Sequence, residues 1–220
     1  MMGYLRDYFE SNQGRLIDKW VPYFEIYERH LERFRGTPVN VLEIGVFHGG
    51  SLQMWKHYFG TRARIVGVDV RPECKRFEED GIEIMIGDQS DPGFLASVQE
   101  AMPTLDILID DGGHYPAQQL ATFEALFPHI SDRGVYICED LHSNYWRRFG
   151  AGPRHPGTFI ERAKSLIDQL TAWHTEDPEE LEVDDFTLTV HGMHFYDSML
   201  VIEKQPMQVP VRRRTGTPAP

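Results

Sequence analysis

Short apolar runs, separated by turn residues and acids, dominate the first two thirds of the chain. They are rich in β-branched side chains, which is typical of strands that are buried on both faces. Stretches of helical periodicity lie between them, and this alternation predicts an α/β fold with a mostly parallel sheet and right-handed crossovers. The predicted strands are Val39–Ile44, Ile65–Val68, Ile82–Ile86, Leu105–Ile109 and Val135–Cys138, and the predicted helices are Ser51–Tyr58, Pro72–Glu78, Phe94–Ala101 and Ala117–Phe127.

The N-terminal segment has a different period. Apolar residues such as Leu16, Trp20 and Phe24 recur at steps of three and four positions. This spacing predicts a helical segment over residues 1–36 with one face turned inward, and Pro22 should kink or divide it.

The C-terminal third predicts one more helix, Thr158–Trp173, and two late strands, Phe186–Val190 and Ser198–Ile202. The main domain should therefore span residues 37–204. Residues 205–220 contain four prolines and a basic triplet, and we expect this tail to be disordered.

Composition and net charge indicate the size of the domain and the kinds of partner that the chain is expected to lack. The chain has 220 residues and 41% hydrophobic side chains, which fits a single α/β unit with a sizeable core. Its net charge of -12 would repel phosphate backbones and anionic lipids, so we expect neither a nucleic acid nor a membrane partner. Two cysteines, the lack of a signal-like start and the lack of a long apolar run predict a cytoplasmic protein.

The first predicted strand ends in a glycine turn, Gly45 to Gly50, that opens the next helix. The spacing differs from both the dinucleotide fingerprint and the phosphate-binding P-loop. Acids end the next two strands, where Asp69 can accept both hydroxyls of a ribose and Asp88 lies at the adenine position. Helix capping is the alternative role for these two acids. The candidate cofactor residues in this region are Glu43, Gly45, Gly49, Ser51, Asp69, Asp88 and Gln89, with Glu43 holding the cofactor's amino group or orienting the turn.

Acids and histidines also follow the fourth and fifth predicted strands. Asp111 and His114 come after one strand, and Glu139 and Asp140 after the other. Because adjacent parallel strands end at the same edge of a sheet, these side chains could converge. Three carboxylates favour a hard ion, best Mg²⁺, with His114 as general base and His142 as a reserve base or supporting residue. An iron site using His114, His142 and a nearby acid is the alternative, and simple turns or caps are another.

The glycine turn and the acids at the strand ends resemble the class I S-adenosylmethionine methyltransferases. Their sheet has seven strands, with the seventh antiparallel and inserted between the fifth and sixth. The motif from Asp110 to His114, the Glu139–Asp140 pair and Tyr145–Trp146 are similar to metal-dependent sugar O-methyltransferases of natural-product biosynthesis. The departure from their common motif is Gly113, where a serine is usual.

This resemblance implies S-adenosylmethionine and Mg²⁺ as cofactors and a glycosylated small molecule as substrate. Asp111, Glu139 and Asp140 would be the metal ligands, His114 the general base, and Asp110 would face the cofactor or support the site. Lys19 and Tyr27 could reach the cofactor's carboxylate from the N-terminal helix. That helix could also cover a neighbour's site in a homo-oligomer.

Three other functions stay open at this point. A catechol-type O-methyltransferase needs the same ion and a vicinal diol. Related chains are also described as cephalosporin hydroxylases, which would make the protein an iron-dependent oxygenase. A nucleoside-binding module without catalysis would need none of the metal ligands.

Overall fold

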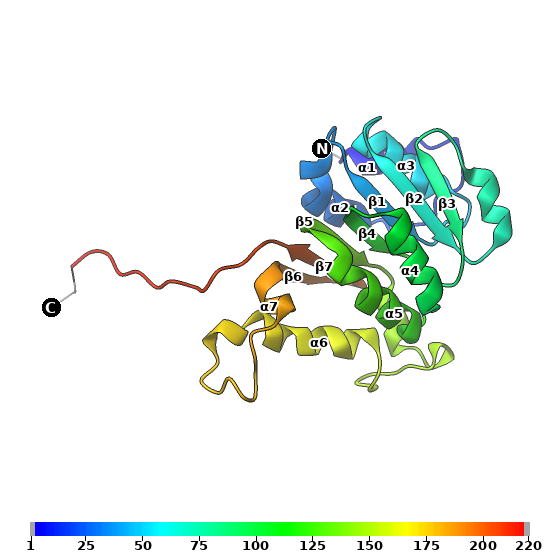
Figure 1. Cartoon of the computed structure of the whole chain (residues 1–220). Coiled ribbons are helices and arrows are strands. Elements are labelled where there is room, and N and C mark those ends of the chain that lie inside the picture. The colour runs from blue at the N-terminus through cyan, green and yellow to red at the C-terminus, as the bar shows by residue number, and fades with distance from the viewer. Residues whose placement is uncertain (1–2, 218–220) are drawn as a thin grey trace.

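A computed structural model describes residues 3–217 of the chain. Its centre is a seven-stranded sheet in the order β3-β2-β1-β4-β5-β7-β6 (Figure 1). The first five strands are parallel, and β7 is antiparallel to both of its neighbours. The strands are β1 Asn40–Ile44, β2 Arg64–Asp69, β3 Ile82–Ile86, β4 Leu105–Asp110, β5 Ile130–Cys138, β6 Val190–Tyr196 and β7 Met199–Lys204. The expected class I fold, including the inserted antiparallel strand, is confirmed.

Helices cover both faces of this sheet. One apolar core packs α1, α2 and α3 against one face, and a second packs α4, α5 and α6 against the other. The α-helices are α1 Tyr4–Glu10, α2 Tyr23–Leu31, α3 Gly50–Phe59, α4 Pro92–Ala101, α5 Pro116–Leu126, α6 Phe159–Leu170 and α7 Asp185–Thr189. The short 3-10 helices are η1 Glu32–Phe34, η2 Pro72–Phe77, η3 Phe127–His129, η4 Leu141–Tyr145, η5 Arg147–Phe149 and η6 Ala172–His174.

The predicted N-terminal helix is wrong over residues 11–22. This stretch is irregular, and Pro22 precedes the first residue of α2. Asn12 competes locally with a helical backbone, since its side-chain oxygen accepts a hydrogen bond from Gly14 N at 2.9 Å. Leu16 and Trp20, which were expected to face the core, are 55% and 59% exposed. Their helical spacing therefore did not reflect a helix.

The predicted strand Phe186–Val190 is also wrong. Residues 185–189 form the short helix α7, because Asp184 accepts a hydrogen bond from Thr187 N at 2.9 Å in a capping box. Strand β6 begins only at Val190 and runs to Tyr196, between the two strands that were expected. The predicted helix Pro72–Glu78 is a 3-10 helix, and the helix predicted from Thr158 ends at Leu170, before η6.

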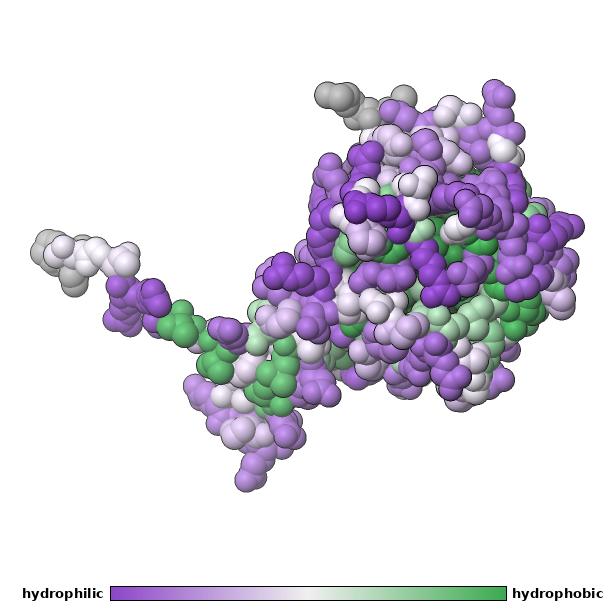
Figure 2. Space-filling view, turned by 45° about the horizontal axis from the view of Figure 1, so that its top comes forward, coloured by the Kyte–Doolittle hydropathy of each residue, from purple (hydrophilic) through white to green (hydrophobic). Residues whose placement is uncertain are grey.

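The surface agrees with an acidic, water-exposed protein. Figure 2 shows a face that is largely hydrophilic, with apolar colour in limited areas and along the extended C-terminal segment. That segment carries Val209 and Val211, which are 65% and 78% exposed. Its start is held to the body, because Gln205 N and Met207 N donate to carbonyls of α7 at 2.8 Å. Among residues 3–217, no helix combines the length and apolarity that crossing a bilayer requires.

Candidate active site

The glycine turn after β1 lies at the point where the strand order reverses. Here β1 has β2 on one side and β4 on the other, which is where open α/β sheets bind ligands. Gly45 has φ +102°, and a Cβ on it would lie 2.0 Å from the carbonyl oxygen of Asp111. Only glycine adopts this backbone conformation and also leaves room for the Asp111 carbonyl. The absence of a side chain at residue 45 therefore lets the turn lie directly against the loop after β4.

Asp69, at the end of β2, holds this turn in place. Its Oδ2 accepts hydrogen bonds from Val46 N at 3.1 Å and Phe47 N at 3.0 Å. Its Oδ1 accepts from Arg71 N at 3.0 Å and Arg71 Nε at 3.2 Å. Burial alone would raise the pKa of Asp69, but the hydrogen bonds from Arg71 and Phe47 outweigh it and lower the pKa. The ionised carboxylate also lines the cavity described below.

Asp88 and Gln89, after β3, have different roles. Asp88 is exposed, lines the cavity and accepts from both the backbone and the hydroxyl of Ser90. The capping alternative for Asp88 is wrong, because Asp91 caps α4. Gln89 is buried, and it joins Asp110 Oδ1 at 3.0 Å to Gly113 N at 2.9 Å. It therefore braces the loop after β4 in addition to lining the cavity.

Asp110 supports the site from beneath. It is 1% exposed and does not belong to the cavity lining among the described residues, which leaves it the supporting role and not a cofactor contact. Its Oδ2 has no hydrogen-bond partner. Burial raises the pKa of Asp110 to about 6.

Glu43 and Ser51 connect β1 to the first turn of α3. Ser51 Oγ donates to Glu43 Oε2 at 2.6 Å, and Trp55 Nε1 donates to Glu43 Oε1 at 3.1 Å. Glu43 is fully buried and does not line the cavity, whereas Ser51 does. Of the two roles expected for Glu43, the structure supports orienting the turn. Gly49 has the left-handed backbone that starts α3 and lies outside the cavity lining.

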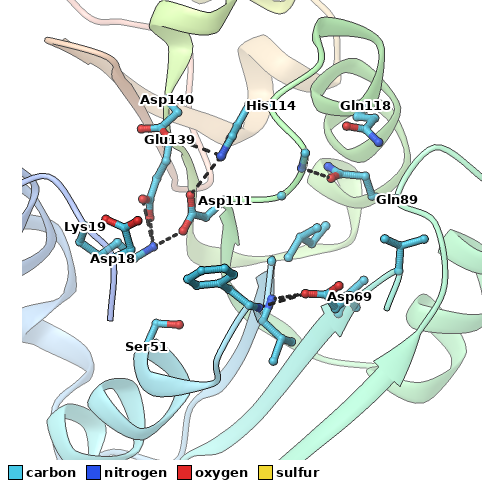
Figure 3. A pocket seen from close by; sticks show the side chains of 18 of the residues that line it. Asp18, Lys19, Ser51, Asp69, Gln89, Asp111, His114, Gln118, Glu139 and Asp140 are labelled. Atoms are coloured by element: carbon cyan, nitrogen blue, oxygen red, sulfur yellow. Dashed lines mark hydrogen bonds and ion pairs between the residues drawn. The ribbon is translucent and has the colours of Figure 1, made fainter. Parts of the chain in front are cut away.

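Lys19 occupies the centre of a buried acidic cluster (Figure 3). Its Nζ lies 2.5 Å from Asp111 Oδ2, 3.0 Å from both oxygens of Glu139 and 3.4 Å from Glu43 Oε1. The lysine comes from the irregular segment between α1 and α2, not from a helix as expected. Its expected partner was the cofactor's carboxylate, but in the structure the side chain is bound by the protein's own acids.

Burial and charge shift the pKa values of this cluster. Burial alone would lower the pKa of Lys19, but the three surrounding carboxylates raise it well above its usual range. Burial, with the negative charge of Asp111 added, raises the pKa of Glu139 well above its usual range although Lys19 opposes the shift. Burial likewise raises the pKa of Asp111.

Two tyrosines of α2 complete the polar contacts. Tyr27 Oη donates to Glu139 Oε1 at 2.6 Å, and Tyr23 Oη donates to Asp140 Oδ1 at 2.8 Å. Tyr27 is fully buried behind Glu139 and does not line the cavity, so in this structure its hydroxyl contacts the protein's own acid. Tyr23 lines the cavity and was missed, because its apolar spacing indicated only a core position.

His114 meets Asp111 and Asp140 across the loops after β4 and β5 (Figure 3). His114 Nε2 lies 3.5 Å from Asp140 Oδ2 and 3.9 Å from Asp111 Oδ1. One ligand atom from each of the three residues lies within 4.8 Å of the others. Both His114 and Asp140 have left-handed backbones, with φ of 58° and 55°. Such strain in non-glycine residues is typical of functional sites.

The remaining predicted residues stand apart from this group. Glu139 directs its carboxylate to Lys19 and Tyr27, and it is not in the three-residue group. His142 packs against Trp146 with ring centroids 4.5 Å apart and the ring planes tilted by 59°. No candidate ligand group among residues 3–217 joins His142 to His114, so the two-histidine site of the iron alternative is not formed.

The glycine turn, Asp69, Lys19 and the group of Asp111, His114 and Asp140 line one cavity of about 760 Å³, a usual size for a small-molecule site. The turn and Asp69 lie along one part, and the acids and His114 along another. Besides Tyr23, the sequence analysis missed several lining residues, because helical spacing indicated a core face for Leu16 and Trp20 and the others were given no role in the site. They are Leu16, Ile17, Asp18, Trp20, Phe47, Arg71 and Gln118.

Comparison with known proteins agrees with this architecture. Residues 42–141 match a family described as a methyltransferase domain. The chain carries a methyltransferase domain. This match begins in β1 and ends just after Asp140, so it contains the glycine turn and both acidic loops.

Two relatives are named for the methylation of natural products. The chain is 39% identical over 191 residues to the demethylmacrocin O-methyltransferase of Streptomyces fradiae, covering 81% of this chain and 47% of the relative. It is 36% identical over 200 residues to a rhamnosyl tetracenomycin-C 2'-O-methyltransferase of Streptomyces olivaceus, covering 86% and 52%. The chain thus spans about half the length of these relatives.

A solved structure extends the likeness to the fold. The MycE methyltransferase of the mycinamycin pathway, in complex with Mg and SAH, superposes with a TM-score of 0.79 at 32% identity. The match covers 92% of this chain and 54% of MycE. The methyltransferase domain described here therefore corresponds to about half of that protein.

Proposed function

We propose that this chain is an S-adenosylmethionine- and Mg²⁺-dependent O-methyltransferase that acts on a sugar hydroxyl of a glycosylated natural product. The observation that carries the proposal is one cavity that joins the glycine turn and Asp69 to Asp111, His114 and Asp140. The relatives support the sugar acceptor, since one is named for a rhamnosyl tetracenomycin and MycE was also solved with Mg, SAH and mycinamycin VI.

The cofactor would lie along the turn after β1. Gly45 keeps the backbone close and free of side chain there, and Asp69 presents an ionised carboxylate to the same part of the cavity. A carboxylate at this strand end can accept the two hydroxyls of a ribose. Asp88, exposed at the end of β3, would lie toward the adenine.

The acids suit a divalent ion. Four carboxylates, from Glu43, Asp111, Glu139 and Asp140, stand against the single ammonium of Lys19 in this cluster. Oxygen donors select hard ions such as Mg²⁺. Asp111 and Asp140 would hold the ion, and Glu139, whose carboxylate contacts Lys19 in this structure, would turn to it as the third ligand.

The chemistry follows from the placement of His114. S-adenosylmethionine would supply the methyl group, and Mg²⁺ would lower the pKa of a coordinated hydroxyl. His114, with Nε2 beside Asp140, would accept the hydroxyl proton as the sugar oxygen forms its bond to the methyl carbon. The carbon–sulfur bond of the cofactor would break in the same step, which would leave S-adenosylhomocysteine as the second product. Asp140 and Asp111 would stabilise the protonated imidazole.

Calorimetric titration of the chelator-treated chain tests the two cofactors separately. S-adenosylhomocysteine should bind first, and Mg²⁺ should then bind to that complex. Binding of the nucleoside without any Mg²⁺ binding would favour a metal-free enzyme or a binding module. If neither bound, the proposal would be rejected.

Methyl transfer to rhamnosylated and other deoxysugar-bearing acceptors, followed by mass spectrometry, tests the reaction. Catechol acceptors belong in the same panel, since turnover of catechols alone would favour the catechol-type enzyme. Asp111→Asn and His114→Ala should each lower turnover by at least about 100-fold. Asp168→Asn and His174→Ala, at exposed positions outside the cavity lining, are the matched controls and should leave turnover unchanged.

A further inference from the structure

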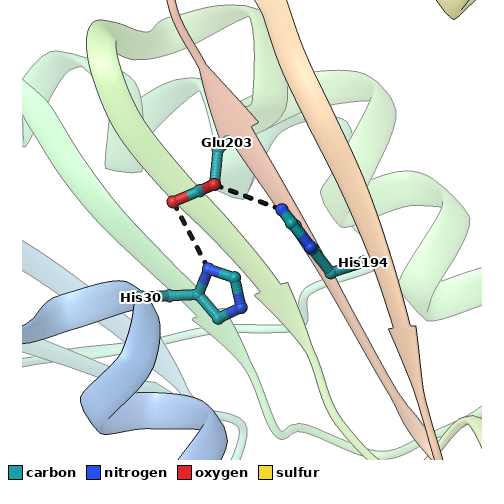
Figure 4. A group of neighbouring side chains, drawn as sticks. All are labelled: His30, His194 and Glu203. Atoms are coloured by element: carbon teal, nitrogen blue, oxygen red, sulfur yellow. Dashed lines mark hydrogen bonds and ion pairs between the residues drawn. The ribbon is translucent and has the colours of Figure 1, made fainter.

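A second group of potential metal ligands lies outside the cavity. His30 comes from α2, His194 from β6 and Glu203 from β7 (Figure 4). His30 Nδ1 lies 3.3 Å from Glu203 Oε1, and His194 Nε2 lies 3.2 Å from Glu203 Oε2. One ligand atom from each residue lies within 4.8 Å of the others. None of the three takes part in the chemistry proposed above.

The donor set differs in kind from that of the acidic cluster. Two imidazole nitrogens and one carboxylate are ligands of zinc and related transition metals, whereas Mg²⁺ prefers oxygen alone. In a tetrahedral zinc site with bonds of about 2.0–2.1 Å, neighbouring ligand atoms are about 3.3 Å apart. Each histidine nitrogen already lies at about this distance from Glu203, His30 Nδ1 at 3.3 Å from Oε1 and His194 Nε2 at 3.2 Å from Oε2.

The surroundings fix the ring of His30 and leave His194 accessible to water. His30 is 3% exposed, and its other nitrogen, Nε2, lies 2.9 Å from the hydroxyl of Tyr196. A partner on the far nitrogen fixes the ring of a metal-binding histidine. The side chain of His194 is 40% exposed, so water can reach the fourth position. Arg33 also donates to Glu203 at 2.8 Å, but its side chain is 46% exposed and can turn into solvent.

We propose that His30, His194 and Glu203 form a binding site for a zinc-type divalent cation. Such an ion would clamp α2 to the hairpin formed by β6 and β7. Tyr23, Tyr27 and His30 recur along α2 at steps of four and three residues, which places them along one face of the helix. Because the two tyrosines contact Asp140 and Glu139, the clamp would also steady the acidic cluster.

Zinc titration of the untagged 220-residue chain carrying Asp111→Asn tests the site, because this background removes one ligand of the acidic cluster. The chain would be stripped with chelator and titrated with ZnCl₂ by calorimetry. One equivalent should bind, and the midpoint of thermal unfolding should rise, since an ion that binds only the folded chain stabilises it. Co²⁺ in place of Zn²⁺ should give the visible absorption of a tetrahedral site.

His194→Ala, added to this background, is the decisive variant, since this half-exposed ring can be removed without opening the core. It should lower zinc affinity by at least about 100-fold and abolish the cobalt spectrum, and Tyr196→Phe should lower the affinity about tenfold. His191→Ala is the matched control, an exposed histidine of the same strand outside the group. The proposal is overturned if His194→Ala binds zinc as its parent does, or if the parent binds none. The cluster would then be a hydrogen-bonded contact alone.

Discussion

Replacing Lys19 by methionine should destabilise the metal-free protein by about 3–5 kcal/mol at pH 8, the usual cost of removing one partner from a buried ion pair. The side chains of Lys19, Glu43 and Glu139 are 2%, 0% and 1% exposed, so water cannot replace the lost ammonium. Asp111 would lose its 2.5 Å contact as well. For a domain of this size, the loss corresponds to a fall of roughly 6–20 °C in Tm.

The stability lost in Lys19→Met should be smaller at low pH than at high pH. Burial raises the pKa of Glu139 and Asp111, and Lys19 opposes that rise. A carboxyl whose pKa is raised on folding contributes stability that is complete below its unfolded pKa, about 4, and is lost as the pH rises through the folded value. Lys19 keeps its charge throughout this range, because its own pKa is raised. The variant should therefore be closer to wild type at about pH 5.5 than at about pH 8.

Urea unfolding of both proteins after chelator treatment, at the two pH values, measures the effect. Lys164→Met is the matched control, because its ion pair with Glu161 is exposed and should contribute less than about 1 kcal/mol. A loss below about 1 kcal/mol for Lys19→Met, equal at both pH values, would show that the acids do not depend on this ammonium.

Three further substitutions test the turn and its supports. Asp69→Ala should lower affinity for S-adenosylhomocysteine by at least about tenfold in calorimetry, because two backbone N–H groups of the turn lose their acceptor and the ribose loses its partner. Gly45→Ala should lower the free energy of unfolding by roughly 3–5 kcal/mol, since the new Cβ would meet backbone at 2.0 Å. In urea unfolding, the free energy of unfolding of Asp110→Asn relative to that of wild type should rise by roughly 1–1.5 kcal/mol as the pH increases from about 5 to about 8. The reason is that the pKa of Asp110, raised by burial to about 6, makes its contribution fall as the pH rises through that value.

Two of these substitutions have a control variant, and the third is judged by its dependence on pH. Asp168→Asn should leave cofactor affinity unchanged, and an equal affinity in Asp69→Ala would reject the ribose contact. Gly36→Ala has φ +66° but no atom within 4 Å of the new Cβ, so it should cost only about 1–2 kcal/mol. Equal losses at the two glycines would mean that the contact with Asp111 does not matter. If the difference in free energy of unfolding between Asp110→Asn and wild type stayed constant with pH, this result would contradict the raised pKa of Asp110.

Much of the fold could be predicted because its elements follow local rules. Each of the first five strands was found within two residues at its carboxyl end, since β-branched runs between turns have few other conformations. β5 begins earlier than expected, at Ile130, because its first residues lie beside a register shift opposite β4. The failures at 11–22 and 185–189 have the same origin. Spacing and composition fitted a helix in the first case and a strand in the second. In both, a side-chain hydrogen bond to the nearby backbone favoured a different local conformation.

For the candidate site, the sequence placed the acids at the right strand ends but not their partners. Tyr23 and Tyr27 had the spacing of core residues, yet a buried tyrosine hydroxyl needs a polar partner. That requirement is the signal by which their contacts with Asp140 and Glu139 could have been anticipated. Lys19 offered no such signal, because nothing local relates it to residues about 90 and 120 positions away.

By itself, the sequence determined which segments form the parallel strands. It also determined the glycine turn and the carboxylates that share one edge of the sheet. Strand ends are set by local chemistry, and parallel strands bring those ends together. Only the tertiary structure decided which acids meet the ammonium of Lys19, which face His114, and which are sealed beneath the loops. It also brought His30 beside His194 and Glu203. These contacts depend on how an irregular segment and a helix pack over the sheet, and the charges and burial that follow exist only once that packing has formed.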